Sequence, residues 1–445
     1  MERPILIAGA TVLSMDDQVG DHVSASILIN GDRITAIGPH VTTADADAID
    51  GTGLIAIPGL VDAHRHIWQS VLTMVAADAD LSTYFAEVPG RLAPAFKVED
   101  AHTANLIGAL QALDAGITSI FDWSHIQHSP DHTDAMVEAL SESGIRAVFG
   151  YGFPNNEPAW SMDSDRPVPE DVRRVRTNVL TSDEARVTMA LSVRGPEQST
   201  LEVTSHDISV ARDLDLRISM HVGNGAFGLP YRSVERMHEA GLLGPDIQYV
   251  HGTSLSDESI QRIADSGGAL AATPAIELQM QFGYPATTRF LAKGVRPGLG
   301  ADVVTSTDQG LFAQMACAFQ AARLQALEHG TPSIDTSDVL AFATIDGARS
   351  IGLDHEVGSL TPGKKADITL LRPSPLVAVN DPVAFAVLGA STQSVDTVIV
   401  DGRVRKRAGQ LVGVDVNGIG QRLQLCLDGL LERSGFEPPK SRLMH

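Results

Sequence analysis

The sequence is poor in cysteine, in aromatic residues and in long apolar runs. Cys317 and Cys426 are the two cysteines among 445 residues, which excludes a disulfide framework. No apolar run reaches ~18 residues, so no membrane-spanning helix is expected, and the start "MERPILIAGATVL" does not resemble a signal peptide. Basic residues number 33 against 55 acidic ones, a net charge of −22 that disfavours binding to nucleic acid. We therefore expect a soluble protein of the cytoplasm, with neither nucleic acid nor a membrane as its partner.

Both ends of the chain carry short β-rich runs. Residues 1–57 contain "PILIAGATVLSM" and "ASILINGDRITAIG", and residues 357–445 contain "GKKADITLLR" and "VDTVIVDGRVRKRAG". Such runs, punctuated by glycine and aspartate, are typical of short antiparallel strands. We expect residues 1–57 and 357–445 to build one small composite β-sandwich domain.

The segment between them, residues 58–356, alternates apolar strand-like runs with helical stretches. The runs include "ITSIFDW" (117–123), "RAVFGYGF" (146–153), "RVTMALSV" (186–193), "RISMHVG" (217–223), "IQYVHG" (247–252), "GALAATP" (268–274) and "GVRPGLGAD" (294–302). Continuous apolar runs predict parallel strands covered on both faces, and about eight strand–helix units predict a (β/α)8 barrel. The predicted fold class is α/β: a TIM-like barrel with a small β-sandwich domain built from both termini.

Two histidines follow the first of these runs, in "IPGLVDAHRHIWQS" (57–70). Side chains at positions i and i+2 of a strand point to the same face, so His64 and His66 are expected to project together. Enzymes with this barrel keep their chemistry at the carboxyl ends of the strands. The pair therefore supplies half of a candidate metal site.

Three more candidate ligands stand where a strand-like run meets a glycine-rich turn. His221 ends "RISMHVG", His251 ends "IQYVHG" and Asp302 ends "RPGLGAD". Three neutral imidazoles and one carboxylate suit a divalent cation. Zinc fits this set, and Fe²⁺, Mn²⁺ and Co²⁺ remain possible.

On these residues the chain resembles the amidohydrolase superfamily. The shared motifs are "PGLVDAHRH", "HVG", "HG", "GLGAD" and the late "GSLTPGKKADITLL" followed by "VDTVIVDGR". The chain is most similar to the branch with cytosine deaminase, atrazine chlorohydrolase and adenosine-type deaminases. The resemblance implies that His64, His66, His221 and Asp302 bind one metal ion, with His251 at the edge of the site.

The resemblance also bears on the number of ions. Two-metal members usually bridge their ions with a carbamylated lysine or a glutamate from a middle strand. Lys97 and Lys293 are the two lysines between His66 and Asp302, and neither falls on the fourth strand-like run. Glu197, past the turn after that run, is the alternative bridging residue. We expect a single ion.

The expected mechanism is attack by a metal-activated water. Asp302 would take the proton from this water and deliver it to the leaving group, and His251 would stabilise the developing charge.

Deaminases of this branch usually carry a glutamate three residues after the fifth-strand histidine, but here that position is Asn224. Asparagine cannot deliver a proton. Glu277 in "TPAIELQ" stands where the branch typically has an asparagine, so carboxylate and amide could have exchanged places; alternatively, Glu277 pairs with Arg289.

Further candidate substrate contacts lie in the loops that follow the first, second and fourth strands, because such loops line the mouth of a barrel. They are Trp68, Gln69, Trp123, His125 and Arg194, together with Asn224.

These features predict a mononuclear metal-dependent hydrolase that cleaves a C–N bond of a small, cyclic nitrogen compound. An alternative is hydrolysis of a carbamate, amide or halide leaving group in the same site, which the loss of the fifth-strand glutamate favours. A second alternative is a binding protein without catalysis. The resemblance further implies a homo-oligomer, a dimer or higher.

Overall fold

The barrel is built from eight parallel strands. The computed structural model describes residues 3–155, 160–330 and 333–438. The strands, hydrogen-bonded in chain order, are β6 (Leu60–Arg65), β7 (Ile117–Ser124), β8 (Arg146–Gly152), β9 (Val187–Ser192), β10 (Arg217–Val222), β11 (Ile247–His251), β12 (Ala269–Ala272) and β13 (Gly298–Leu299). An isolated parallel bridge between Arg65 and Asp302 joins the last strand region to the first and closes the barrel. The predicted fold class is confirmed.

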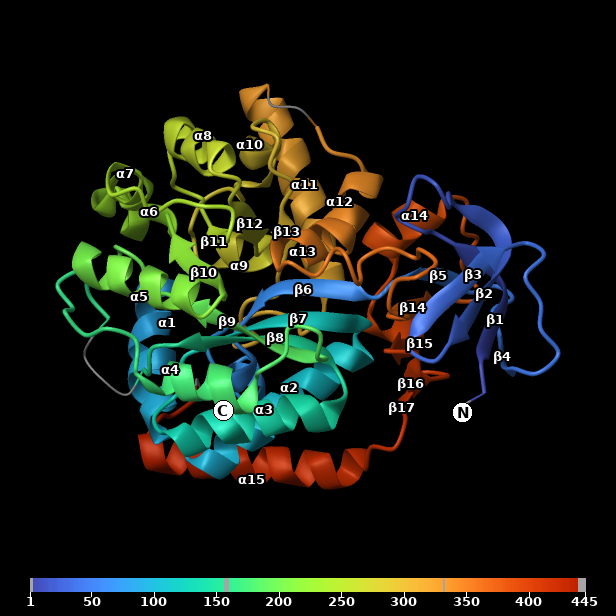
Figure 1. Ribbon diagram of the computed structural model, residues 1–445, viewed down its shortest axis with the longest axis horizontal. Helices are drawn as coiled ribbons and strands as arrows, with labels where there is room; N and C mark the ends of the chain where they lie inside the picture. The colour runs from blue at the N-terminus through green and yellow to red at the C-terminus, as the bar shows by residue number, and fades with distance from the viewer. Residues whose placement is uncertain (1–2, 156–159, 331–332, 439–445) are drawn as a thin grey trace, which may run out of the picture.

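Helices surround the strands and cover the barrel (Figure 1). They are α1 (Leu81–Glu87), α2 (Val98–Asp114), α3 (Pro130–Ser143), α4 (Asp171–Arg174), α5 (Leu201–Asp213), α6 (Gly225–Gly228), α7 (Ser233–Glu239), α8 (Asp257–Asp265), α9 (Pro274–Gln279), α10 (Thr287–Leu291), α11 (Leu311–His329), α12 (Thr336–Phe342) and α13 (Ile345–Ser350). Side-chain caps begin several of them, as where Thr200 accepts from Val203 N and Ser256 accepts from Ser259 N.

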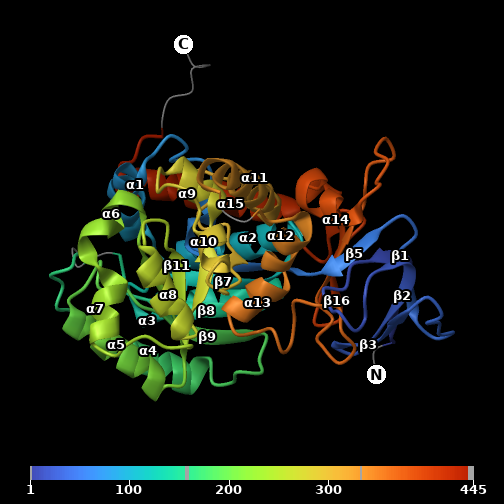
Figure 2. The same ribbon diagram turned by 90° about the horizontal axis from the view of Figure 1, so that it is seen from above.

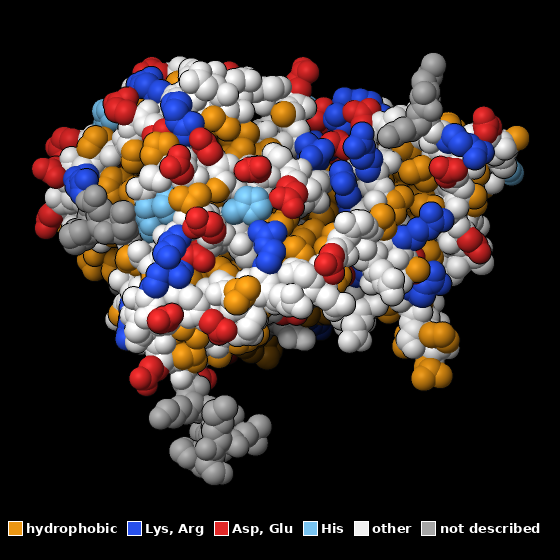
Figure 3. Space-filling view, turned by 90° about the horizontal axis from the view of Figure 1, so that it is seen from below, with side chains coloured by type: hydrophobic (Ala, Val, Ile, Leu, Met, Phe, Trp, Pro, Cys, Tyr) orange, Lys and Arg blue, Asp and Glu red, His pale blue; other side chains and the backbone are white. Residues whose placement is uncertain are grey.

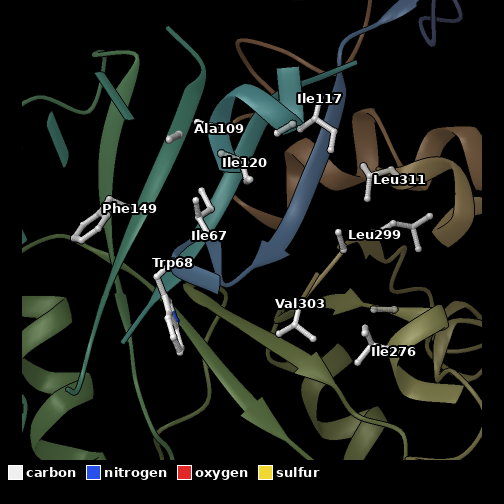
Figure 4. Packing of buried hydrophobic residues seen from close by; sticks show 14 of the residues in the cluster. Ile67, Trp68, Ala109, Ile117, Ile120, Phe149, Ile276, Leu299, Val303 and Leu311 are labelled. Atoms are coloured by element: carbon white, nitrogen blue, oxygen red, sulfur yellow. The ribbon is translucent and has the colours of Figure 1, made fainter. Parts of the chain in front are cut away.

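Burial of apolar side chains on both faces of the strands explains the continuous apolar runs. Every residue of β7, β8 and β9 is buried. Ile120, Phe149 and Leu299 belong to the buried cluster whose members pack between strands and helices in Figure 4. Each such side chain contributes about 1.5–3 kcal/mol when fully buried, so the barrel core is a rigid base for the mouth.

A second sheet stands beside the barrel and is made from both ends of the chain (Figure 2). Its strands are β1 (Ile5–Val12), β2 (His22–Asn30), β3 (Arg33–Gly38), β4 (Asp47–Asp50), β5 (Ile55–Pro58), β14 (Ile368–Leu371), β15 (Val395–Val400), β16 (Arg403–Arg407) and β17 (Gln410–Leu411). They form one continuous nine-stranded mixed sheet, and a bridge between Arg33 and Lys365 brings its β3 edge back toward β14. The expected sandwich is thus a single sheet folded over its own apolar core, which includes Ile7, Ile27 and Ile399.

The last long helix departs from the expected division of the chain. Residues 416–434 form α15 (Val416–Ser434), which lies against α2 of the barrel rather than in the small sheet (Figure 1). Cys426 and Leu430 are its buried side chains. The β-rich pattern of residues 357–411 therefore does not extend to the end of the chain, and residues 439–445 lie outside the described part.

The junction between the two parts is short. β5 of the small sheet is followed by Gly59 alone before β6 of the barrel begins. A Cβ atom on Gly59 would lie 2.0 Å from Thr118 Oγ1, so only glycine fits this crossing. The chain that pairs in the small sheet thus runs directly into the strand that bears the first two histidines.

Charges of both signs are interspersed on the face seen from below (Figure 3). Within the described ranges, none of the helices combines the length and the apolar character needed to cross a bilayer.

Candidate active site

His64 and His66 lie at the carboxyl end of β6, as their spacing predicts. The two rings meet edge to face, with 4.9 Å between their centroids. Arg65, which separates them, forms an ion pair with Asp62 at 2.8 Å, and both of these side chains are fully buried. Asp62 also accepts from the backbone of Ala301 at 3.0 Å. This pair anchors the turn at the end of β6 to the segment that precedes Asp302.

The other three predicted residues converge on the same point. His221 comes from β10, His251 ends β11 and Asp302 follows β13. Ligand atoms of two overlapping groups lie within 4.8 Å of one another: His64, His221 and His251 form one group, and His64, His66 and Asp302 form the other. Asp302 Oδ1 lies 3.3 Å from His64 Nε2 and 3.4 Å from His66 Nε2. We name these five residues the mouth cluster.

Two members of the mouth cluster have left-handed backbones. The φ angle is +70° at His251 and +59° at Asp302, a region that non-glycine residues rarely occupy. The backbone of Asp302 is fixed by two hydrogen bonds of 2.9 Å, one donated to His64 O and one accepted from His66 N. The fold therefore holds both side chains over the barrel axis at some conformational cost, as is common at functional sites.

The protonation states of the mouth cluster suit a divalent cation. Burial, reinforced by His64, lowers the pKa of His66 to about 3, and burial lowers the pKa of His221 well below its ordinary value. Burial opposes ionisation of Asp302, but the neighbouring imidazoles of His64 and His251 hold its pKa well below its usual range. Neutral imidazoles beside an ionised carboxylate are the donors that zinc and related ions bind.

Hydrogen bonds behind the cluster also fit a metal site. His66 Nδ1 lies 2.7 Å from the carbonyl of Trp123, so a proton on Nδ1 leaves Nε2 free to face the cluster. Neither ring nitrogen of the buried His64 makes a hydrogen bond within the described chain. A cation shared with the buried carboxylate would provide a partner for one of these two ring nitrogens.

Two of the predicted substrate contacts from β7 line the cavity above the cluster. The ring of Trp123 packs against His221, with 4.6 Å between centroids, and His125 Nε2 lies 2.9 Å from His66 Nδ1. Asn155 hydrogen-bonds to the other ring nitrogen of His125. Burial, together with His66, lowers the pKa of His125 far below its ordinary value, so this wall presents a neutral imidazole.

Three other predicted substrate contacts lie behind the residues that line the cavity. Their positions differ from the prediction that they touch substrate. Trp68 is fully buried and packs edge-on against His125, and Gln69 donates to the hydroxyl of Tyr84 at 2.6 Å. Arg194 lies over the ring of Phe153 at 3.8 Å and donates to Ser164. None of the three is among the described residues that line the cavity. Beyond each strand end the backbone no longer alternates side chains between two faces. The sequence pattern therefore could not predict the direction of these three side chains.

Asn224 and Glu277 lie at different depths: Asn224 lines the cavity, and Glu277 lies behind His251. Asn224 lines the cavity, and its Oδ1 is buried without a hydrogen-bond partner among the described residues. Glu277 is fully buried beside His251, with Oε1 3.3 Å from His251 Nδ1 and 2.8 Å from Thr273 N. The interpretation that Glu277 pairs with Arg289 is wrong, because the arginine is bound to Asp257 at 2.7 Å. The two residues have therefore not simply exchanged places across the cavity.

The candidate bridging groups for a second ion lie away from the mouth cluster. Glu197 accepts hydrogen bonds from Gly223 N at 2.7 Å and from Ser233 Oγ at 2.8 Å, behind the turn that follows β10. Lys97 precedes α2, and Lys293 follows α10. Among the described residues, Glu197 does not belong to the groups able to hold a metal.

The cavity above the mouth cluster has a volume of about 430 Å³. Much of its lining was not predicted: Leu81, Tyr84, Phe85, Pro89, Gly90, Asn155, Trp160, Gln198, Phe227, Met280, Phe282 and Val303. Several of these come from long insertions between a strand and its helix, such as residues 67–97. The length of that insertion is the signal that sequence reasoning could have used.

A closed eight-stranded barrel with four imidazoles and a carboxylate at its mouth is an arrangement that can hold a catalytic metal ion. The chain belongs to the amidohydrolase family: the sequence model described as "Amidohydrolase family" matches residues 55–405. It is accordingly assigned to a family of hydrolases.

Similar proteins agree with this assignment. The chain is 28% identical to a 5'-deoxyadenosine deaminase of Methanothermobacter thermautotrophicus, over 92% of this chain and 94% of that one. Its fold matches an adenosine deaminase from Xanthomonas campestris with bound zinc (TM-score 0.86, 19% identity, 96% and 98% of the two chains). It also matches atrazine chlorohydrolase from Arthrobacter aurescens complexed with zinc (TM-score 0.85, 24% identity, 95% and 100%).

Proposed function

We propose that the protein is an aminohydrolase that releases ammonia from a small, cyclic nitrogen compound. The observation that carries the proposal is the mouth cluster, in which His66, His221 and Asp302 line a cavity of about 430 Å³ and His64 contacts all three. The deaminase names of similar proteins support the reaction type.

A single divalent ion, held by these four residues, completes the proposed site. Zinc is the proposed ion because the donor set is neutral imidazole and carboxylate, and because the titles of two solved structures of similar fold name bound zinc. The same donors also accept Fe²⁺, Mn²⁺ or Co²⁺. When bound, such an ion acidifies water and so supplies a nucleophile at neutral pH.

Asp302 and His251 are the proposed proton-handling and polarising groups. Asp302 Oδ2 faces His251 Nε2 at 3.8 Å, with both side chains at the cavity floor. The carboxylate is ionised, so it can accept a proton from the attacking water and pass it to the leaving group. For His251 to donate from Nε2 toward the attacked centre while Nδ1 also carries a proton, a carboxylate has to balance the positive charge of the ring.

Glu277 is placed to provide that balance. Its Oε1 and the hydroxyl of Thr273 flank His251 Nδ1 at 3.3 and 3.1 Å. A carboxylate behind an imidazole fixes the ring orientation and keeps the proton on the nitrogen that faces it. We therefore propose that Glu277 acts through His251 and does not itself protonate the substrate.

Asn224 favours one alternative reaction in the same site. It stands where deaminases of this branch have a proton-delivering glutamate, and an amide cannot deliver a proton. Hydrolysis of a substrate whose leaving group departs without protonation, such as a halide, would not need that glutamate. Carbamate and amide substrates belong to the same alternative, and the fold match to a chlorohydrolase is compatible with it.

The proposed function is tested on purified protein by metal analysis and a substrate panel. We expect about one zinc per chain, loss of activity with a chelator, and ammonia release from an aminated purine, pyrimidine or triazine. Chloride release from chlorinated analogues without any ammonia release would select the alternative reaction. A metal-loaded protein inactive on both the aminated and the chlorinated compounds would point to a binding protein.

Two further proposals concern the protein as a whole. We propose a homo-oligomer, because α11 exposes Leu324 and Leu327 to solvent at 44% and 83%. Light scattering on the eluted protein measures its mass directly, and a monomer at micromolar concentration would contradict this. We also propose a cytoplasmic location, which cell fractionation tests.

A further inference from the structure

We propose that the substrate is an uncharged heterocycle with a bulky apolar substituent, and that Phe85 and Phe227 hold this substituent at the mouth. The inference rests on the proposed function, because it places the reacting ring at the mouth cluster. It goes further by assigning the part of the cavity beyond the mouth cluster to the substituent of the substrate.

The charge of the cavity argues for an uncharged substrate. Among the described residues of its lining, Asp302 is the one carboxylate, and arginine, lysine and glutamate are absent. A carboxylate or phosphate on the substrate would lose water in a mostly apolar cavity whose described lining offers no cationic side chain to pair with it, which is unfavourable. Arg194, the nearest predicted candidate for that task, is engaged behind the wall with Ser164 and Phe153.

The apolar part of the cavity begins at the cluster and continues to the surface. Phe282 packs edge-on against His251, with 5.1 Å between the ring centroids. Phe85 of α1 and Phe227 of α6 lie 6.0 Å apart, and Phe227 is 39% exposed. Segments far apart in the chain thus present two aromatic rings to each other at the open end, where an apolar group could pack on both.

The size of the cavity leaves room for such a group. A volume of about 430 Å³ lies within the range of pockets that enclose drug-sized ligands, and a single heterocycle would fill only part of it. An unsubstituted ring at the cluster would leave Phe85 and Phe227 in contact with water.

One polar group is left to orient the ring. Asn224 is 5% exposed, and its Oδ1 has no hydrogen-bond partner in the described structure although it lines the cavity. A ring N–H would satisfy this oxygen, whereas a buried orphan acceptor is unfavourable. With one ring edge held by Asn224, a substituent on the opposite edge is directed away from Asn224.

The test measures binding of product-like compounds that the enzyme cannot turn over. Calorimetry on the zinc-loaded protein compares hypoxanthine, 9-benzylhypoxanthine and 9-(4-carboxybenzyl)hypoxanthine, with the matching series on uracil. In at least one series we expect the benzyl compound to bind about tenfold more tightly than the bare ring, and the carboxybenzyl compound to lose that gain. Phe85→Ala and Phe227→Ala should each weaken the benzyl compound about fivefold and leave the bare ring unchanged.

Two variants control for folding. Leu229→Ala removes a neighbouring apolar side chain that is 62% exposed and outside the cavity lining, and should change nothing. Phe227→Leu keeps an apolar group and should retain most of the affinity. Equal binding of all three compounds, tighter binding of the carboxylate, or no binding in either series would overturn the inference. Because the compounds are not substrates, a failed ammonia assay would leave the binding result standing, and ammonia release with equal binding would refute this inference alone.

Discussion

Glu277 is a fully buried carboxylate whose ion-pair partner in the described structure is an imidazole, His251. Its other oxygen, Oε2, makes no hydrogen bond within the described residues. Burying a carboxylate in this way costs stability, which points to a specific task for Glu277. Orientation of His251 is the task that the geometry supports.

Replacing Glu277 by glutamine tests this task. The amide oxygen can still accept from His251 Nδ1, but the negative charge is lost. We expect kcat to fall about 10–100-fold with little change in KM or in metal content. Steady-state kinetics and metal analysis measure the three quantities, and Glu328→Gln on the exposed part of α11 is the matched control. A normal kcat would show that the carboxylate charge is not used.

Asp122 provides a prediction for stability against pH. Its side chain accepts from Ile67 N at 3.2 Å and from Asn105 at 2.8 Å, and burial raises its pKa to about 7. The unfolded value is 3.8, so the folded state binds a proton more tightly than the unfolded state. Its contribution to stability is therefore present below about pH 4 and is lost as the pH rises through 7.

Asp122→Asn removes this titration. Between pH 5 and pH 8 the wild-type unfolding temperature should fall by about 2–4 °C more than that of the variant. Differential scanning calorimetry at both pH values, with the same metal loading, measures the difference. Asp165→Asn at an exposed position should follow the wild type. Parallel pH profiles for wild type and Asp122→Asn would contradict the assignment.

The sequence predicted the position of a site residue well when that residue lay at the end of a strand. His64, His66, His221, His251 and Asp302 were predicted to converge, and they do, because the ends of parallel strands meet at one edge of a barrel. The positions of candidates a few residues beyond the strand ends were harder to predict. Trp68, Gln69 and Arg194 lie past the strand ends, where no period fixes the side-chain direction.

At the level of elements, the closing seam of the barrel is the least regular part. β13 has only two residues, and beyond it the seam is closed by the bridge between Arg65 and Asp302. Gly300 lies inside this seam, where a Cβ atom would come within 2.5 Å of His64 O. The close approach of the two backbones thus depends on glycine.

Gly300→Ala should open the seam and disturb the ligands that flank it. We expect a loss of about 1–3 kcal/mol in stability, typical of overpacking, and at least tenfold weaker metal binding. Competition with a chromophoric chelator measures metal affinity, and thermal unfolding measures stability. Gly420→Ala on α15 is the control, because nothing lies within 4 Å of its added Cβ. Unchanged metal affinity would show that the seam can adapt.

The strand-like runs predicted seven of the barrel strands after the first, but not the elements that cover the mouth. α1 and α6 are short, and several of their apolar residues line the cavity, so they show no helical period. The packing of α15 on α2 could not be predicted from the sequence either, because the two helices lie more than 300 residues apart in the chain. Such long-range packing leaves no local pattern.

At the scale of the whole molecule, the barrel and the small sheet are joined by a buried arginine. Arg146 begins β8 and binds Asp367 at 2.9 Å and Asp401, both from the C-terminal half of the small sheet. It lies at the amino end of the strand, opposite the mouth cluster. The ion pairs therefore serve assembly rather than catalysis.

Arg146→Met should separate stability from activity. Removing one partner of a buried pair leaves Asp367 uncompensated, which costs about 3–5 kcal/mol. We expect a lower unfolding temperature but unchanged kcat per metal-loaded molecule at 25 °C. Arg3→Met, at a side chain that is 57% exposed, should stay within about 0.5 kcal/mol of wild type. A kcat that falls with stability would show that the small sheet shapes the mouth.

The pairing of β5 with β14 also sets an order of events during synthesis. β5 leaves the ribosome early, but its partner is made only after the whole barrel has been translated. Until then the outer edge of β5 has no strand beside it, although the next residues already belong to the first barrel strand. Contacts between such distant segments form slowly. A nascent chain stalled before residue 368 would therefore hold a nearly complete barrel with an open strand edge, the state in which a chaperone would be of most use.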